Sequence, residues 1–331
     1  MTETVRPGFP ELIDNTLRSD FIKCGQLAFR SHVQNIGPIT PSIHLHAGAA
    51  LAKAFEVTRR AYHETHLEIP ECIRLGLQKL IEAYGPINLP QGKQGDKSLD
   101  NCIRAFDSYF QQYPLESDQL VPFVAPNGKA MLEFTFSIPL ELKHPQTGNP
   151  LIFAGRTDMI ADRLRSGQLF VVDEKTTTQL GEQWANQWDL DSQNTGYIFA
   201  ARSYGIPVMG AVIRGIGMLK TKITHAEVIV HRADWVIERW WEQLNRDVAR
   251  MIRSWEEGYW DYAVDKAACN AYGGCPFKML CESPQPDQWL STHFRKRHWN
   301  PLAKDEGQDL LHDKELLKQL ESPDIPFSDL T

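Results

Sequence analysis

The sequence contains no uninterrupted run of about eighteen apolar residues, the length that a membrane-spanning helix requires, so we expect no transmembrane segment and no membrane partner. Its first residues lack the basic start and apolar centre of a secretion signal, which favours the cytoplasm, where thiols stay reduced. Positive charge is not in excess, because the formal net charge is −7 at pH 7. That balance argues against a basic coat for nucleic acid over the whole protein. Internal repeats and low-complexity blocks are also absent.

The 331 residues are 23% charged and 42% hydrophobic, which is ordinary for a globular protein and sufficient for one large domain with appendages. The negative charge is concentrated at one end. Residues 300–331 contain three Lys and eight Asp or Glu, which leaves a net charge of −2 for residues 1–299. A nearly neutral body can still carry a basic groove. We expect the acidic tail to be disordered, to bind a partner protein, or to form a single weak helix.

Hydrophobic periodicity predicts helices in the first part of the chain and mainly strands after it. Helices are expected at residues 42–66, 71–84, 99–113, 184–204 and 233–257, and strands at residues 130–142, 207–219 and 224–231. The first of these strands is the clearest, because all its even positions are apolar. Two further short strands joined by a tight turn are expected between residues 151 and 178. This order predicts an α/β fold with a mixed central sheet flanked by helices.

The stretch Leu151–Thr178 concentrates the chemistry of the sequence. Side chains alternate along a strand, so Asp173 and Lys175 share one face of the second strand, and Glu174 points to the other face. A hairpin can bring Asp158 of the first strand beside that pair. Two carboxylates and an ammonium group at one place are costly unless something uses them, and carboxylate oxygens suit Mg²⁺ or Mn²⁺. The alternative is a solvated hairpin with a surface ion pair.

The residues GRTD at 155–158 and DEKT at 173–176 resemble the signature of the PD-(D/E)xK nuclease superfamily. In particular they resemble its RecB-type form, in which G-x-x-D is followed by D-x-K-T. No proline precedes Asp158, although the full signature has one. The resemblance implies a restriction-endonuclease-like core at residues 126–257, preceded by an N-terminal helical region at residues 1–125.

Two further features of the core bear on the site. Gln193 and Tyr197 are spaced i and i+4 on one helix face, and they match the Q-x-x-x-Y pair that follows D-x-K in RecB-type nucleases and helps to shape the site. Glu133 lies on the polar face of the strand that precedes Asp158. It is a candidate metal ligand or a hydrogen-bonded support, and the alternative is a solvated side chain.

An early helix departs from the family pattern. The related nucleases often carry G-x-x-x-H there, with the histidine as a metal ligand, but Gly48 is followed at that spacing by Ala52. Either His46 or His44 takes this role, or the metal site has one ligand fewer. The other reading of His46 is an exposed or structural side chain at the start of the helix.

Three of the six cysteines form a C-x5-C-x5-C array at Cys269, Cys275 and Cys281. Three thiols so close together in a protein expected to be cytoplasmic favour metal ligation over disulfide pairing. Cys24 is the natural fourth ligand. The remaining two cysteines, Cys72 and Cys102, lie on apolar helix faces and are predicted to be buried small hydrophobic residues.

One N-terminal cysteine and three C-terminal cysteines around a D-x-K core resemble the iron–sulfur RecB-like nucleases. These include the AddB nuclease domain, CRISPR-associated RecB-like exonucleases and phage proteins of similar build. The resemblance implies a [4Fe–4S] cluster on Cys24, Cys269, Cys275 and Cys281, which would clamp the chain ends through a cysteine-rich segment at residues 258–299. The family spacing is C-x2-C-x5-C, and the first gap here is longer. Zinc, or no metal, therefore stays open.

The resemblance implies a metal-dependent DNA nuclease, with exonuclease activity favoured, that acts in recombination and repair or in phage DNA processing, in the host cytoplasm if phage-encoded. The predicted metal ligands are Asp158 and Asp173, with Glu133 or His46 as possible additions, and the other predicted catalytic residues are Lys175, Gln193 and Tyr197. Single-stranded DNA or duplex ends would be held by phosphate contacts, for which the candidates are Lys220, Lys222, Arg295, Lys296 and Arg297.

Two other functions remain open at this point. The first is a nuclease-fold protein that has lost catalysis and serves as an iron–sulfur DNA-binding or structural subunit, which the missing histidine at position 52 favours. The second is a sequence-specific endonuclease stapled by zinc. The intact triad of Asp158, Asp173 and Lys175 opposes the first of these.

Overall fold

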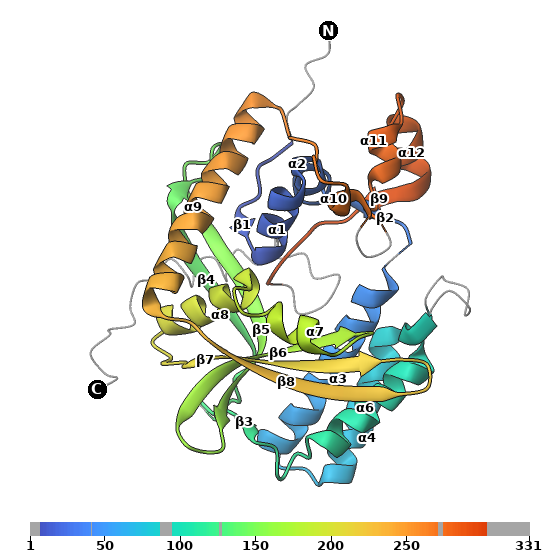
Figure 1. Ribbon diagram of the computed structural model, residues 1–331, viewed down its shortest axis with the longest axis vertical. Coiled ribbons are helices and arrows are strands. Elements are labelled where there is room, and N and C mark those ends of the chain that lie inside the picture. The colour runs from blue at the N-terminus through green and yellow to red at the C-terminus, as the bar shows by residue number, and fades with distance from the viewer. Residues whose placement is uncertain (1–6, 41, 87–94, 126–127, 271–273, 303–331) are drawn as a thin grey trace.

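The computed structural model describes residues 7–40, 42–86, 95–125, 128–270 and 274–302. Its centre is a seven-stranded mixed sheet (Figure 1). The strands are β1 (Leu12–Ile13), β3 (Leu120–Pro122), β4 (Leu132–Lys143), β5 (Pro150–Arg163), β6 (Gln168–Thr177), β7 (Gly210–Met218) and β8 (Ile223–His231). Strand β5 pairs in parallel with β1 and antiparallel with β3, β4 and β6. The sheet continues through a parallel β6–β7 pair and an antiparallel β7–β8 pair. The predicted mixed α/β fold and the hairpin of β5 and β6 are therefore confirmed.

Two long helices cover one face of the sheet. These are α8 (Ser192–Ser203) and α9 (Asp234–Glu257), whose buried side chains pack against those of β5, β6 and β7. The single helix predicted over residues 184–204 is wrong at its start, because the chain forms the short α7 (Glu182–Asn186) and then a turn. Asp191 ends that turn by accepting the N–H of Asn194 at 2.8 Å, which caps α8.

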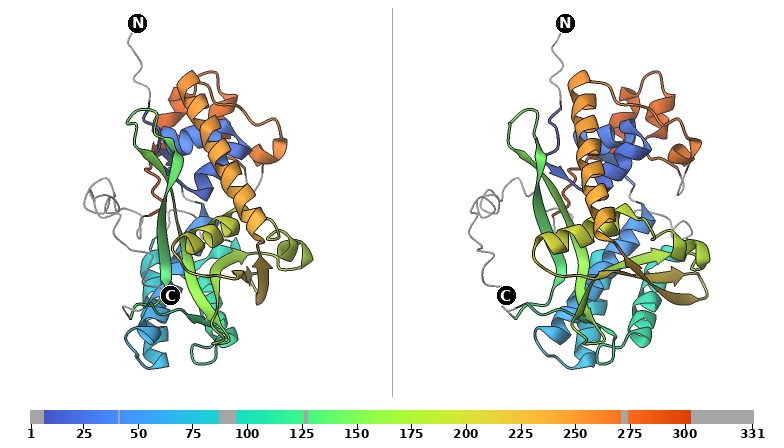
Figure 2. Two further views of the ribbon diagram at one scale, coloured as in Figure 1. Left: turned by 90° about the vertical axis from the view of Figure 1, so that its left-hand side faces the viewer. Right: turned by 60° about the vertical axis from the view of Figure 1, so that its left-hand side comes forward.

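Three helices form a bundle against the opposite face at one end of the sheet (Figures 1 and 2). They are α3 (Ile43–His63), α4 (Ile69–Tyr84) and α6 (Leu99–Gln112), and a short 3-10 turn, η2 (Gly95–Lys97), precedes the last. Helices α3 and α4 approach closely because Gly76 has no side chain; a Cβ there would lie 1.9 Å from Thr58 Oγ1. Cys72 and Cys102 are fully buried in this bundle, as predicted.

The two ends of the described chain lie side by side (Figure 1). The N-terminal segment comprises α1 (Asn15–Lys23), α2 (Gly25–Ala28), the π-helical turn η1 (Phe29–Val33) and β2 (Ile36–Pro38). The C-terminal segment comprises α10 (Lys266–Asn270), α11 (Lys278–Glu282), α12 (Asp287–His293) and β9 (Phe294–Lys296). Strands β2 and β9 form a separate antiparallel pair, and Arg18 of α1 binds Asp247 of α9 at 2.8 Å.

Cys24 lies at the junction where α1 ends and α2 begins, outside both helices. Within the described ranges, no helix is long and apolar enough to cross a membrane. Of the acidic tail, only residues 300–302 belong to the described part of the chain.

Candidate active site

The strands that carry the predicted acids separate at the site. Pairing between β5 and β6 runs from Arg163 and Gln168 to Met159 and Val172, and ends there. The next residue on β5 is Asp158, which continues this register opposite Asp173 of β6. The sheet therefore opens at the level of the two aspartates, and both lie beside its last β5–β6 pair.

The backbone of β6 sets the orientation of Asp158. Oδ2 of Asp158 accepts the backbone N–H of Glu174 at 2.7 Å. The neighbouring Thr157 donates from Oγ1 to the carbonyl of Val172 at 3.1 Å. Side-chain oxygens of β5 thus take up backbone polar groups of β6 where the strand pairing has ended, and they satisfy groups that would otherwise be buried without partners.

A chain of polar contacts links β6 to α8. Lys175 Nζ lies 2.7 and 3.0 Å from the two carboxylate oxygens of Asp173. It also donates to Gln193 Oε1 at 3.1 Å, and Gln193 Nε2 donates to the hydroxyl of Tyr197 at 2.8 Å. The structure therefore brings together Asp158, Asp173, Lys175, Gln193 and Tyr197, the five residues proposed from the sequence.

Burial and neighbouring charges shift the pKa values of Asp158, Asp173 and Lys175. Burial and the neighbouring Asp173 and Glu174 carboxylates raise the pKa of Asp158 well above its usual value. Burial also raises the pKa of Asp173, although the ammonium of Lys175 counteracts it. Burial lowers the pKa of Lys175, but the two aspartates outweigh this effect and the net shift is upward. A cation placed at the aspartates would relieve the repulsion between them.

Glu133 lies near this group but is bound elsewhere. It sits on β4 between the Leu132–Met159 and Phe134–Thr157 pairs, with its backbone at φ 52°. Its carboxylate is buried and lies 2.5 Å from Arg156 Nε. It is close enough to contribute to the raised pKa of Asp158. Glu133 is therefore a buried, ion-paired carboxylate and not the solvated side chain that was the alternative.

His46 is directed into the helical bundle. Its Nε2 lies 2.6 Å from the carbonyl oxygen of Tyr84, and the two rings pack edge to face at a centroid distance of 4.9 Å. The structure does not group His46 with the two aspartates, and His44 is exposed. The same helix does reach the site strand, because a Cβ on Gly48 would lie 3.7 Å from Thr176 Oγ1.

Sequence reasoning missed the partners of Glu174. Although Glu174 was expected to point away from Asp173 and Lys175, no partner was assigned to it. The structure pairs its buried carboxylate with Arg59 of α3 and with the hydroxyl of Tyr109 of α6. The available signal was a glutamate in a strand that begins with an apolar run, because a carboxylate buried there needs a cation or a hydrogen-bond donor.

The residues fit a magnesium or manganese ion but not an all-protein metal cage. In the part of the chain that the structure describes, no three His, Cys, Asp or Glu side chains are grouped closely enough to hold one ion. Mg²⁺ in substrate-cleaving sites commonly uses one or two carboxylates and takes its other ligands from water and substrate phosphate. Asp158 and Asp173 supply that number of hard oxygen ligands.

The four cysteines of the predicted cluster come from both ends of the chain. Cys269 lies in α10 and Cys281 in α11, with Cys275 between them, and all are free thiols, as is Cys24. Burial raises the pKa of Cys275, and the charges of Cys281, Cys24 and Cys269 add to that shift. Within the described residues, these thiols are not grouped closely enough to hold a metal ion.

The basic residues proposed for phosphate contacts occupy two places. Lys220 and Lys222 are exposed in the turn between β7 and β8. Arg295, Lys296 and Arg297 are exposed on and just after β9, beside the N-terminal segment. Lys296 Nζ donates to the carbonyl of Gln34 at 3.1 Å, so its ammonium is already engaged.

The chain was compared with family models, curated proteins and solved structures. The family model of the PD-(D/E)XK nuclease superfamily matches residues 44–282, which include both strands that carry the aspartates. No curated protein matches the sequence. Among solved structures, the match to a candidate exonuclease from Eubacterium rectale has 12% identity and a TM-score of 0.45, and it covers 78% of this chain and 87% of that one. The match to the protein SSO0001 has 13% identity and a TM-score of 0.27, with 72% and 83% covered. On the extent of the family match, the chain belongs to the PD-(D/E)XK nuclease superfamily.

Proposed function

We propose that this protein is a metal-dependent deoxyribonuclease, with exonuclease action favoured, that hydrolyses phosphodiester bonds of DNA. The observation that carries the proposal is the pairing of the partly buried Asp158 with the buried Asp173, with Lys175 beside them, where β5 and β6 separate. Burial raises the pKa of both carboxylates, and the charge of Asp173 adds to the shift of Asp158. Shifted pKa values of this kind are common in functional sites.

Asp158 and Asp173 would hold the metal ion. Bound there, Mg²⁺ or Mn²⁺ would polarise the scissile phosphate and lower the pKa of a water molecule. The backbone N–H of Glu174 fixes one oxygen of Asp158, which leaves its other oxygen to face the metal. Glu133 supports the site through its ion pair with Arg156. His46 is bound to Tyr84 and is not part of the proposed ligand set.

Lys175 acts as a fixed positive charge. In the metal-free protein the two aspartates raise the pKa of Lys175 above its usual value, so its ammonium is protonated near neutral pH. It can donate hydrogen bonds to the attacking water or to a phosphate oxygen and offset the charge that develops there. Gln193, held by Tyr197, keeps this ammonium at the site.

We also propose that Cys24, Cys269, Cys275 and Cys281 bind a [4Fe–4S] cluster that joins the chain ends. The influence of the other three thiols on the pKa of Cys275 supports this set, and so does the adjacency of the two terminal segments. When bound, the cluster would contribute folding free energy and link α1 and α2 to the C-terminal segment.

Cleavage of end-labelled DNA tests the nuclease proposal. The protein, purified without oxygen, is incubated with single-stranded and duplex substrates in Mn²⁺, beside Asp173→Asn and Lys175→Ala. We expect metal-dependent cleavage that Asp173→Asn abolishes and that Lys175→Ala strongly reduces. Asp162→Asn, on the same hairpin but outside the site, is the matched control and should cut like the wild type. A brown protein that cuts no substrate would instead support the catalytically inactive iron–sulfur subunit, and a colourless protein that cuts would support the nuclease without the cluster.

A further inference from the structure

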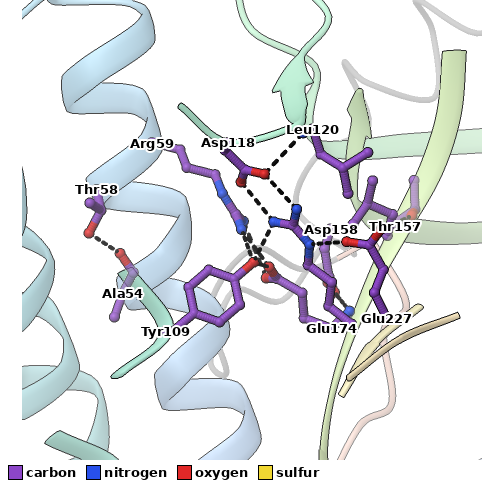
Figure 3. Close-up of polar contacts among 12 residues, drawn as sticks. Ala54, Thr58, Arg59, Tyr109, Asp118, Leu120, Thr157, Asp158, Glu174 and Glu227 are labelled. Carbon is purple, nitrogen blue, oxygen red and sulfur yellow. Dashed lines mark hydrogen bonds and ion pairs between the residues drawn. The ribbon is translucent and has the colours of Figure 1, made fainter. Parts of the chain in front are cut away.

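Behind the proposed active site, on the other face of β6, lies a buried network of charges (Figure 3). The carboxylate of Glu174 receives hydrogen bonds from Arg59 Nη1 at 3.2 Å, and closer ones from Arg59 Nη2 and from the Tyr109 hydroxyl. Arg59 Nη2 also donates to the Tyr109 oxygen at 2.7 Å. Only 5% of the Arg59 side chain and 4% of the Glu174 side chain are exposed, so this ion pair is shielded from solvent.

The network continues across the sheet. Arg214 of β7 donates to Tyr109 at 3.1 Å and makes two hydrogen bonds with Asp118, at 2.6 and 2.7 Å. Its Nε lies 3.1 Å from a carboxylate oxygen of Glu227 on β8. Tyr109 thus links the guanidinium groups of Arg59 and Arg214. Through these contacts the network joins α3 and α6 to β6, to β7 and, by way of Arg214, to β8.

Glu174 connects this network to the proposed site through a single residue. Its side chain is held by α3 and α6, its backbone N–H holds Asp158, and its chain neighbours are Asp173 and Lys175. At this level β6 has lost its pairing with β5 and is paired only with β7, where Glu174 lies opposite Arg214. Side-chain contacts from the helical bundle to the Glu174 carboxylate therefore hold β6 at a level where its pairing with β5 has ended.

We propose that Arg59 and Tyr109 are positioning residues that fix β6 at Glu174 and so set the distance between the carboxylates of Asp158 and Asp173. This inference rests on the proposed nuclease function and deepens it. Glu174 need not touch the substrate, because it acts through the backbone that carries Asp173 and Lys175 and through its N–H to Asp158. The helical bundle is then a support for the metal site as well as a covering of the sheet.

The test compares the removal of this support with the removal of a charge elsewhere in the same network. The double variant Arg59→Met/Glu174→Gln removes the ion pair and leaves no unpaired buried charge. Tyr109→Phe is a milder variant that removes only the hydroxyl. Glu227→Gln is the matched control, because it neutralises a carboxylate bound to Arg214 without contact with Glu174. Thermal melting establishes that each variant is folded.

The readouts are the affinity for Mn²⁺, measured by calorimetry without DNA, and the kcat and KM for cleavage. Outer partners of metal ligands typically change affinity or activity by about 10- to 100-fold when lost. We expect the double variant to bind Mn²⁺ about 10-fold or more weakly and to lose kcat with little change in KM. Tyr109→Phe should show the same changes at smaller size, whereas Glu227→Gln should match the wild type.

The outcomes separate the two proposals. If the double variant and Tyr109→Phe melt at lower temperature but bind Mn²⁺ and cut like Glu227→Gln, the network only stabilises the fold and the positioning role is wrong. If the double variant does not fold, Tyr109→Phe decides by the same measurements. If the wild type binds Mn²⁺ but cuts no DNA, the nuclease proposal fails, and the calorimetric comparison still decides whether the network positions the two aspartates.

Discussion

Ionised Asp158 lowers the stability of the folded, metal-free protein, because it lies beside other carboxylates in the proposed metal site. Its carboxylate is partly buried beside Asp173 and Glu174, and its only described donor is a backbone N–H. A protein without a use for this charge would gain stability by replacing it, and such gains commonly accompany loss of function at active sites.

The first prediction is that Asp158→Asn stabilises the protein in the absence of metal. The pKa of Asp158 is raised in the folded chain, so between the usual carboxyl pKa near 4 and the raised value the folded chain holds a proton that the unfolded chain has lost. Stability must therefore fall as pH rises through this window. Asparagine does not ionise and can still accept the Glu174 N–H, so the free energy of unfolding at pH 7 should rise by about 1 kcal/mol.

Thermal melts of the metal-free protein between pH 4 and pH 8 measure this effect. The gain should be small at pH 4 and largest at neutral pH, and Asp162→Asn should show none. Mn²⁺ should raise the melting temperature of the wild type but not of Asp158→Asn. Equal stabilisation of both variants by Mn²⁺ would mean that Asp158 is not a metal ligand.

The second prediction concerns the charge of Lys175. Lys175→Met should lower kcat by about 10²- to 10³-fold, the usual loss when one donor to a developing negative charge is removed. Lys175→Arg keeps the charge but not its compact geometry and should lose less. Single-turnover cleavage rates at saturating Mn²⁺ measure the loss, with Lys143→Met, at the exposed end of β4, as the control. A rate for Lys175→Met close to that of the wild type would exclude the proposed role.

At the scale of elements, the contrast between the central hairpin and the terminal segments is the main feature. The hairpin of β5 and β6 is continuous in sequence and embedded in the sheet. The terminal segments meet through the β2–β9 pair, through backbone hydrogen bonds such as the one from Arg297 N to Asn35 O at 2.8 Å, and through a small apolar cluster that joins Leu27 and Ile36 to Phe277. A pair of short strands is at most marginally stable by itself, so a further link between these segments would add to their stability.

The third prediction is that the proposed cluster supplies this link. Cys275→Ser should abolish the visible absorbance of the anaerobically purified protein, because a hydroxyl is a poor ligand for iron. It should also make the terminal segments sensitive to limited proteolysis while the central sheet stays folded. Cys102→Ser, in the bundle, is the control and should keep its colour. A colourless wild type would contradict the cluster. If that protein contained bound zinc, zinc would be the metal that links the terminal segments.

At the scale of the whole molecule, a sheet lies between two long helices and a bundle of three, and the proposed active site lies where β5 and β6 separate. The protein is acidic overall, so attraction to the proposed DNA substrate would have to come from local groups of basic residues. The exposed turn between β7 and β8, with Lys220 and Lys222, is one such group.

The fourth prediction follows from counterion release. The logarithm of DNA affinity should fall linearly with the logarithm of salt concentration, with a slope of about one for each phosphate contacted. Removing Lys220 and Lys222 together should reduce this slope by about two if both contact phosphates. Arg74→Ala removes a charge on α4 that is already paired with Glu71, and it should leave the slope unchanged. Binding measured in EDTA keeps the DNA intact, and an unaltered slope in the double variant would exclude the turn from the interface.

The sequence by itself determined the features that depend on local spacing. Alternation along a strand placed Asp173 with Lys175, and the i and i+4 spacing placed Gln193 with Tyr197, as the structure shows. These predictions succeeded because the side-chain period of a strand or helix follows from backbone geometry alone. The helix break before Asp191 was missed because a short turn between two helical stretches changes the hydrophobic pattern very little.

Only the tertiary structure decided the contacts between distant segments. Arg59 and Glu174 are 115 residues apart, and nothing in the spacing of either residue identifies the other. The same holds for Glu133 with Arg156 and for His46 with Tyr84, whose partners decide whether each side chain is available to a metal ion. A local pattern states which face a side chain occupies, but the packing of elements determines what that face meets. The sequence therefore located the chemistry of this protein, and the fold determined how its charges are held in place.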